Sequence, residues 1–126
     1  MRLYSPEWVA AFNEAVAGVE AGTGVSFRML QVVHDGPEGT LRVGLSAEGG
    51  TVRMELDPPD QPAPEVTVSV GYADAAALAR GELDPAQLLA AGRVKVRGDL
   101  SVLVRGQVIL AEAAGRLEGL SERTTT

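Results

Sequence analysis

The chain has 126 residues, a net charge of −6 and no cysteine. A chain of this length forms one domain and buries roughly two-thirds of its unfolded surface, which is enough for a hydrophobic core. The acidic balance argues against nucleic acid as the main partner, and the lack of cysteine excludes disulfides and fits a cytoplasmic location. No apolar run approaches the ~20 residues that span a bilayer, and no basic leader opens the chain, so neither a membrane span nor a secretory signal is expected.

The first predicted element is an amphipathic helix that begins at Ser5. Serine is a preferred N-cap, and Pro6 suits the first helical position because an N–H there would have no partner in the helix. Apolar residues then recur at helical spacing, at Trp8, Phe12, Ala15 and Val19. The pattern predicts about four turns that end near Gly22.

Three strands are predicted next, over residues 25–34, 40–46 and 51–56, because apolar and polar residues alternate there. In the first of them, one side carries Val25, Phe27, Met29, Gln31 and Val33. Short loops join the three strands, which favours an antiparallel meander. Residues 57–65 hold four of the seven prolines, which predicts an extended crossover to the next strand.

Residues 66–100 are predicted to contain two more strands and two short helices. Residues 66–72 alternate as the fourth strand, residues 73–80 form an alanine-rich helix with Asp74 as its expected cap, and residues 93–97 alternate as the fifth strand. Asp84 and Pro85 are expected to begin the second short helix, and Gly92 is expected to end it. Gly98 is expected to end the fifth strand, and Asp99 to cap the helix that follows.

The last helix is predicted to run from Asp99 to about Leu117. Its main apolar stripe contains Leu100, Leu103, Val104, Val108, Ala111 and Leu117. Further apolar residues widen this stripe beyond one face, which a surface helix rarely needs. Residues 121–126 are polar and are expected to form a frayed tail.

Together these elements predict an α+β fold. All five strands are apolar on one side and largely polar on the other, which is typical of a sheet with helices on one face and water on the other. The expected architecture is a five-stranded mixed sheet, made of the meander, the crossover and two further strands, in a single domain over residues 1–126.

Residues 81–100 also resemble the sterol carrier protein type-2 domain, a family of lipid-binding domains. The matching positions are Gly81, Leu83, Asp84, Pro85, Gly92, Lys95, Gly98 and Asp99. The sequence departs at Leu88 and Leu89, where the family often has Phe, and at Arg93, where it usually has Lys. The order of elements is also similar to that family, so the resemblance implies its fold over most of the chain and a carrier role rather than an enzyme.

A lipid-sized cavity between the apolar side of the sheet and the helices is the candidate site. Its expected lining is Trp8, Phe12, Phe27, Met29, Leu88, Leu89, Leu103, Val104 and Val108, with Gln107 as the polar group that meets a head group. Periodicity alone favours an ordinary core for these residues, and the resemblance shifts the expectation toward a fatty acid, acyl-CoA or sterol-like ligand. The alternative is an interaction or regulatory module with a filled cavity. A transient contact with a membrane surface is expected, and the oligomeric state is left open.

Other polar residues give weaker signals. Arg28, Arg42 and Arg53 lie on the polar side of neighbouring strands, where they could meet anionic head groups, although a solvated face with arginines paired to acids is the favoured interpretation. His34 is the single histidine and is interpreted as a strand-end residue. No cluster of side chains indicates a catalytic or metal site, and no cofactor is expected.

Overall fold

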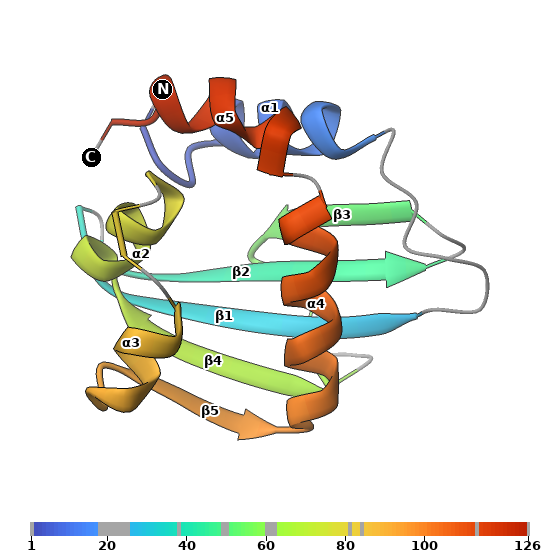
Figure 1. The fold of residues 1–126 in the computed structure, drawn as a ribbon, viewed down its shortest axis with the longest axis vertical. Helices are drawn as coiled ribbons and strands as arrows, with labels where there is room; N and C mark the ends of the chain where they lie inside the picture. Colours follow the sequence, from blue (N-terminus) through green and yellow to red (C-terminus); the bar gives the residue numbers. More distant parts are fainter. Residues whose placement is uncertain are drawn as a thin grey trace.

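A five-stranded mixed sheet is covered on one face by helices, as the sequence predicts (Figure 1). The computed structural model describes residues 2–17, 26–37, 39–48, 51–59, 63–80, 82–83, 85–112 and 114–125. The strands are β1 (Phe27–Gly36), β2 (Gly39–Glu48), β3 (Thr51–Leu56), β4 (Val66–Gly71) and β5 (Val94–Gly98). The helices are α1 (Pro6–Val16), α2 (Tyr72–Ala79), α3 (Pro85–Ala90), α4 (Leu100–Glu112) and α5 (Ala114–Glu122).

The strand order is β3-β2-β1-β4-β5, so β1 is the central strand. The predicted antiparallel meander of β1, β2 and β3 is confirmed, β4 is parallel to β1, and β5 is antiparallel to β4. In this register Gln31 of β1 lies opposite Val43 of β2 and Val68 of β4. Gln31 therefore lies in the middle of the sheet, among apolar neighbours.

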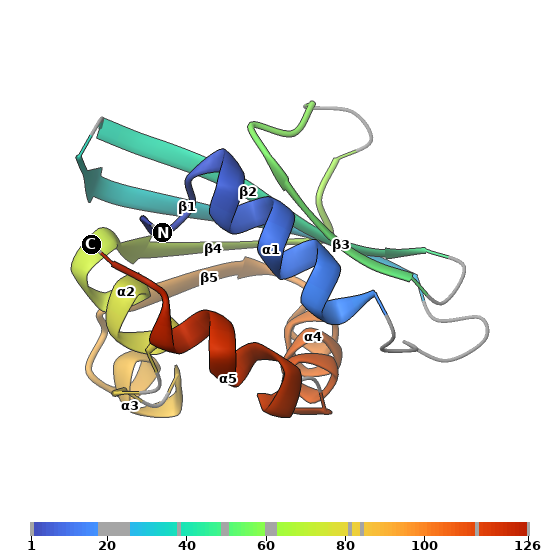
Figure 2. The ribbon, with the colours of Figure 1, turned by 90° about the horizontal axis from the view of Figure 1, so that it is seen from above.

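The crossover from β3 to β4 runs over the sheet face that is opposite the helices (Figure 2). Pro58 packs on Gly44 of β2 so closely that a Cβ atom at Gly44 would lie 3.1 Å from the Pro58 Cγ. The Glu65 N–H donates to the Arg28 carbonyl at 2.9 Å. The expectation that this face is open to water is therefore only partly correct, because the crossover covers some of it. Asp60, Gln61 and Pro62 lie outside the described residues.

Helix α1 begins as the sequence predicts. The Trp8 N–H donates to the Ser5 side-chain oxygen at 3.1 Å, and Pro6 is the first helical residue. The helix ends at Val16, earlier than expected, where the Ala17 N–H closes a tight last turn on the Glu14 carbonyl. The expected end near Gly22 lies outside the described residues.

Helix α2 differs from the prediction at its start. Tyr72 begins the helix rather than ending β4, and the N-cap is Gly71, without a side-chain cap. Asp74 is therefore not the cap. Its carboxylate instead pairs with Arg93 at the start of β5, whose Nε donates to Asp74 Oδ2 at 3.2 Å.

The end of α3 and the start of α4 follow the prediction, although Asp84 lies outside the described residues. Gly92 has a φ of +73° after α3, and Gly98 has a φ of +113° at the end of β5. A Cβ atom at Gly98 would lie 2.4 Å from the Glu65 carbonyl oxygen, so only glycine fits this position. Asp99 caps α4, because its carboxylate accepts hydrogen bonds from the Ser101 N–H at 2.9 Å and the Ser101 hydroxyl at 2.6 Å.

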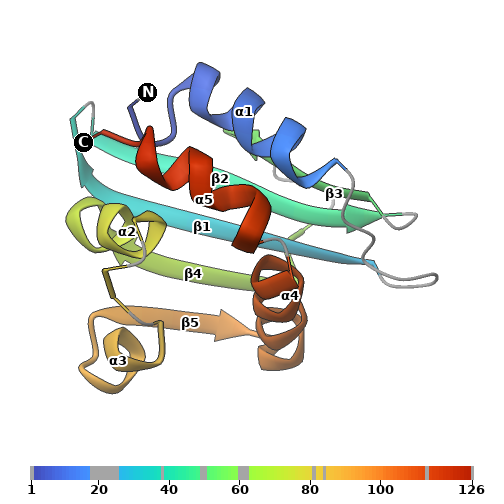
Figure 3. The same cartoon turned by 45° about the horizontal axis from the view of Figure 1, so that its top comes forward.

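The predicted single last helix is wrong, because the chain forms α4 and then a second helix, α5, which runs across the end of α4 (Figure 1). Helix α5 lies beside α1 and runs in the opposite direction (Figure 3). This change of direction buries Leu120, which is 3% exposed, whereas a straight continuation of α4 would carry it away from the core.

The expected frayed tail is also wrong for the residues that the structure describes. The Leu3 N–H donates to the Thr125 carbonyl at 2.9 Å, so the two chain ends are joined. Thr124 is buried, and its side-chain oxygen accepts a hydrogen bond from the Trp8 indole nitrogen at 2.9 Å. A buried indole N–H needs an acceptor, and the polar end of the chain supplies it.

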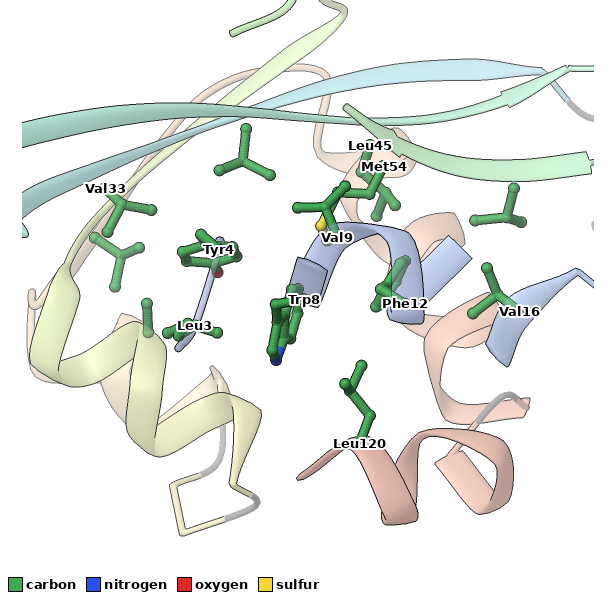
Figure 4. Close-up of a cluster of buried hydrophobic side chains, with 14 of the residues drawn as sticks. Leu3, Tyr4, Trp8, Val9, Phe12, Val16, Val33, Leu45, Met54 and Leu120 are labelled. Atoms are coloured by element: carbon green, nitrogen blue, oxygen red, sulfur yellow. The ribbon is translucent and has the colours of Figure 1, made fainter. Parts of the chain in front are cut away.

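An aromatic cluster fills the space between α1, α5 and the sheet (Figure 4). Trp8 stacks on Phe12 with ring centroids 5.7 Å apart, and the edge of Tyr4 meets Trp8 at 5.3 Å. Leu120 of α5 closes the cluster from the side away from the sheet. This cluster forms one wall of the space described next.

Candidate functional site

A cavity of about 850 Å³ lies between the sheet and the helices. Its strand residues are Met29, Gln31, Leu45, Met54, Val68, Val70, Val94 and Val96. Its apolar residues from the helices and the adjoining segments are Tyr4, Trp8, Phe12, Ala75, Leu78, Ala79, Leu83, Leu89, Leu103, Gly106, Gly115, Leu117 and Leu120. The volume falls within the range of about 300–1,000 Å³ that ligand pockets occupy, and the lining is mainly apolar with a few polar groups, as in such pockets.

Helix α4 approaches the sheet closely at Gly106, which lines the cavity. A Cβ atom at Gly106 would lie 2.8 Å from the Met29 Cε and 3.8 Å from the Phe27 ring. Val102, one turn earlier, is fully buried. These contacts fix which side of α4 faces the sheet.

Tyr4 and Gln31 form a polar pair in this mainly apolar lining. The Tyr4 hydroxyl donates to the Gln31 side-chain oxygen at 3.2 Å. Burial raises the pKa of the Tyr4 hydroxyl well above its usual value, and the hydrogen bond to Gln31 offsets this only in part, so the hydroxyl stays neutral. Tyr4 also has a φ of +59°, a conformation that costs a non-glycine residue on the order of 1–3 kcal/mol and that occurs often at ligand sites.

Charged groups that line the cavity come from α5 and from the end of α2. Arg80 donates from its Nε to one oxygen of Glu82 at 3.0 Å and from a terminal nitrogen to the other at 3.3 Å. Glu118 and Glu122 of α5 are exposed and form no ion pair with another described residue. The charged part of the lining is therefore acidic, with its arginine already paired.

The structure places five of the predicted site residues on the cavity lining, namely Trp8, Phe12, Met29, Leu89 and Leu103. Phe27 and Leu88 are buried but belong to the core outside the lining. The side chain of Gln107 lies outside the described part of the structure. The sequence pattern did not single out Gln31, although a polar amide on the apolar side of a central strand was the signal.

Val104 and Val108 do not line the cavity, which corrects the prediction. Together with Leu100 they form an outer stripe on α4, and the three side chains are between 52% and 59% exposed. The spacing of four residues puts them on one side of the helix. Because α4 is apolar around most of its circumference, its periodicity could not identify the buried side, which the close contact at Gly106 determines.

On the opposite face of the sheet, one of the three arginines, Arg42, is paired with an acid. Arg42 lies 3.8 Å from the Asp57 carboxylate and donates to the Pro58 carbonyl at 3.4 Å, as the solvated-face interpretation expects. His34 is exposed near the end of β1. In the described part of the chain, no group of His, Cys, Asp or Glu could hold a metal ion, and no helix is long and apolar enough to cross a membrane.

The sequence matches a family model described as the SCP-2 sterol transfer family over residues 12–111. None of the curated proteins compared with the chain matches it. Among solved structures, palmitated SCP2L2 from Aedes aegypti is 21% identical with a TM-score of 0.63 over 83% of this chain and 94% of that chain. A Thermus thermophilus protein described as possibly a sterol carrier protein is 19% identical, with a TM-score of 0.61 over 96% of this chain and 88% of that one.

A part of a larger enzyme has the same fold. The sec-alkylsulfatase Pisa1 from Pseudomonas sp. is 20% identical with a TM-score of 0.53, over 86% of this chain and only 15% of the sulfatase chain. At these identities the solved structures support a shared fold.

Proposed function

Because the chain belongs to the SCP-2 sterol transfer family, we propose that it is a non-enzymatic carrier that binds a lipid-like molecule in the cavity. The expected ligands are a fatty acid, an acyl-CoA or a sterol-like compound. The observation that carries the proposal is the open apolar volume of about 850 Å³ beneath the helices. A cytoplasmic location stays a prediction.

The size of the hydrophobic contribution supports this function. Each buried methylene group contributes about 0.8 kcal/mol, so a dozen of them contribute on the order of 10 kcal/mol before the cost of ordering the ligand. The alternative, an interaction module with a filled cavity, is less consistent with this volume.

The test is to fill the cavity from β5. Val96 lines the cavity, whereas Lys95 is exposed on the other side of the same strand. We expect Val96→Phe to weaken the binding of a fluorescent fatty acid about tenfold or more, since the added ring occupies ligand space. Lys95→Phe is the matched control and should leave binding unchanged. The absence of saturable binding to fluorescent fatty acids and sterols by the wild-type protein would contradict the carrier function.

We expect α4 to move when a ligand enters, because α4 lines the cavity through Leu103 and Gly106 and its outer stripe is exposed. The crossover lies on the opposite face of the sheet, so its movement would not open the cavity (Figure 2). Amide hydrogen exchange should therefore be faster in α4 than in β1. Uniform protection of the two elements would count against this route.

The outer stripe of α4 is the proposed membrane contact. Its three side chains, with the half-exposed Leu89 of α3, present far less than the ~800 Å² that each partner contributes to a standard protein interface. A few apolar side chains suffice for transient contact with a bilayer. Val104→Asp should slow ligand transfer to vesicles without weakening ligand binding, whereas Ala10→Asp on the exposed side of α1 should do neither. Equal transfer rates for the wild type and Val104→Asp would refute this contact.

A further inference from the structure

In the pair of Tyr4 and Gln31, the amide nitrogen of Gln31 is a hydrogen-bond donor without a partner among the described residues. Gln31 lies on the central strand between Val43 and Val68, so its neighbours on the adjoining strands are apolar. Its side-chain oxygen accepts the hydrogen bond from the Tyr4 hydroxyl at 3.2 Å. Its amide nitrogen forms no hydrogen bond with another described residue, and Gln31 lines the cavity. An amide N–H₂ group in an apolar site favours an acceptor oxygen on the occupant.

Tyr4 orients the side-chain amide of Gln31. A neutral tyrosine hydroxyl can donate to the amide oxygen, and the Tyr4 ring is held by its edge contact with Trp8 at 5.3 Å. With its oxygen engaged, the amide of Gln31 presents donors to the cavity. Tyr4 is therefore a positioning residue for Gln31.

The charges around the cavity determine which kind of acceptor fits. Among the described residues of the lining, Arg80 is the cation, and its Nε and one terminal nitrogen are bonded to the two carboxylate oxygens of Glu82. Glu118 and Glu122 also line the cavity and repel an anion. Because a buried carboxylate without a cation is strongly disfavoured, the acceptor that suits Gln31 is uncharged.

We infer that Gln31 selects ligands that carry an uncharged acceptor oxygen, such as an alcohol, an ester or a ketone, over ligands with an ionised carboxylate. This inference rests on the proposed carrier function and identifies the ligand class for the same cavity. It narrows the expected ligands, because a free fatty acid would bind less tightly than a neutral compound of the same chain length.

The experiment compares three probes with the same sixteen-carbon chain: hexadecanol, hexadecanoate at pH 8 and hexadecane. Each probe competes with a fluorescent apolar dye for the wild-type protein. Hexadecanol should bind about fivefold or more tightly than hexadecane, because it gains a hydrogen bond with Gln31, and hexadecanoate should bind more weakly than hexadecanol. Hexadecanoate that binds as tightly as hexadecanol would overturn the inference.

Two variants assign the selectivity to Gln31. Gln31→Leu should remove the preference for hexadecanol over hexadecane, while Gln87→Leu, the same change on the exposed side of α3, should keep it. If Gln31→Leu does not fold, Tyr4→Phe provides the second measurement, because it keeps the ring and frees the amide to turn, so the preference should fall. A preference that persists in the variants that fold would refute the role of Gln31. If none of the probes binds the wild-type protein, the carrier function itself fails, which is a distinct result.

Discussion

The two sides of the helix layer are packed to very different degrees. On the side of α1 and α5, Trp8 is 5% exposed and Leu120 is 3% exposed. On the side of α3 and α4, Leu88 and Val102 anchor the helices, but the outer stripe of α4 is more than half exposed. The cavity lies between these two sides and takes lining residues from both.

Polar contacts reinforce the same contrast. Asn13 of α1 bonds twice to the backbone of Met54 in β3, donating at 2.9 Å and accepting at 2.7 Å. The segment between α3 and β5 is joined to α2 by the ion pair of Arg93 and Asp74, in which the Arg93 side chain is 56% exposed. Regions with few buried contacts open at lower free energy than the core. We therefore expect α1 and α5 to form a fixed wall of the cavity, and α3 and α4 to form a wall that opens at lower free energy.

The difference in packing between the two sides can be tested with the same substitution at two leucines. Leu120→Ala on the packed side should reduce the free energy of unfolding by about 2–5 kcal/mol, because it removes a buried side chain and leaves a void. Leu100→Ala in the outer stripe should reduce it by less than about 0.5 kcal/mol, since this side chain is 59% exposed. Urea denaturation measures both values. Similar losses at the two positions would show that the two sides are equally packed.

A smaller effect is expected where the chain ends meet. Thr124→Val keeps the shape of the side chain but leaves the Trp8 indole N–H buried without its acceptor, and it removes the hydrogen bond that the Thr124 hydroxyl donates to the Leu120 carbonyl at 2.7 Å. Together these losses should cost about 1–3 kcal/mol of unfolding free energy. Because Trp8 is the single tryptophan, its fluorescence reports unfolding directly. Thr125→Val is the matched control, as its side chain is exposed. A loss for Thr125→Val as large as that for Thr124→Val would rule out the hydrogen bonds of the Thr124 hydroxyl as the cause.

The packed side also shows where the sequence was sufficient and where it was not. Ser5-Pro6 carries its own local signal, so the start of α1 was predicted correctly. The partner of Trp8 was not, because Thr124 is 116 positions away and belongs to a polar stretch typical of a loose end. Local patterns identify caps and strand alternation, whereas contacts between distant segments depend on how the chain folds back.

The open side was harder to predict for a different reason. Residues 100–111 are apolar around most of the helix, so no period could separate Val104 from the buried Val102. The close approach at Gly106 settles this orientation, and it becomes apparent only when Met29 lies beneath it. For the candidate site, the aromatic residues were predicted from their spacing. The role of Gln31 became apparent only from its hydrogen bond with Tyr4, which lies 27 positions away in the sequence.

The smallest expected effect concerns the start of α4, on the open side. Hydrogen bonds from the Ser101 side chain and then its backbone N–H lower the pKa of Asp99 below its usual value. A carboxyl with a lowered folded-state pKa contributes stability above its unfolded-state pKa and loses that contribution as the pH falls through the folded-state value. Asp99→Asn keeps an N-cap side chain but removes the charge, so the wild type should be the more stable of the two at pH 6, and the difference should disappear in strongly acidic solution.

Urea denaturation from pH 6 down to pH 2.5 measures this difference, with Glu55→Gln on the exposed side of β3 as the control. A gap between the wild type and Asp99→Asn that stays constant over this range would mean that the charge of Asp99 has no part in holding α4. If the gap closes on acidification, the binding of a cavity ligand should be re-measured at low pH. A looser start of α4 should then speed ligand exchange, because α4 belongs to the wall that opens at lower free energy, whereas the packed side of α1 and α5 should be unaffected.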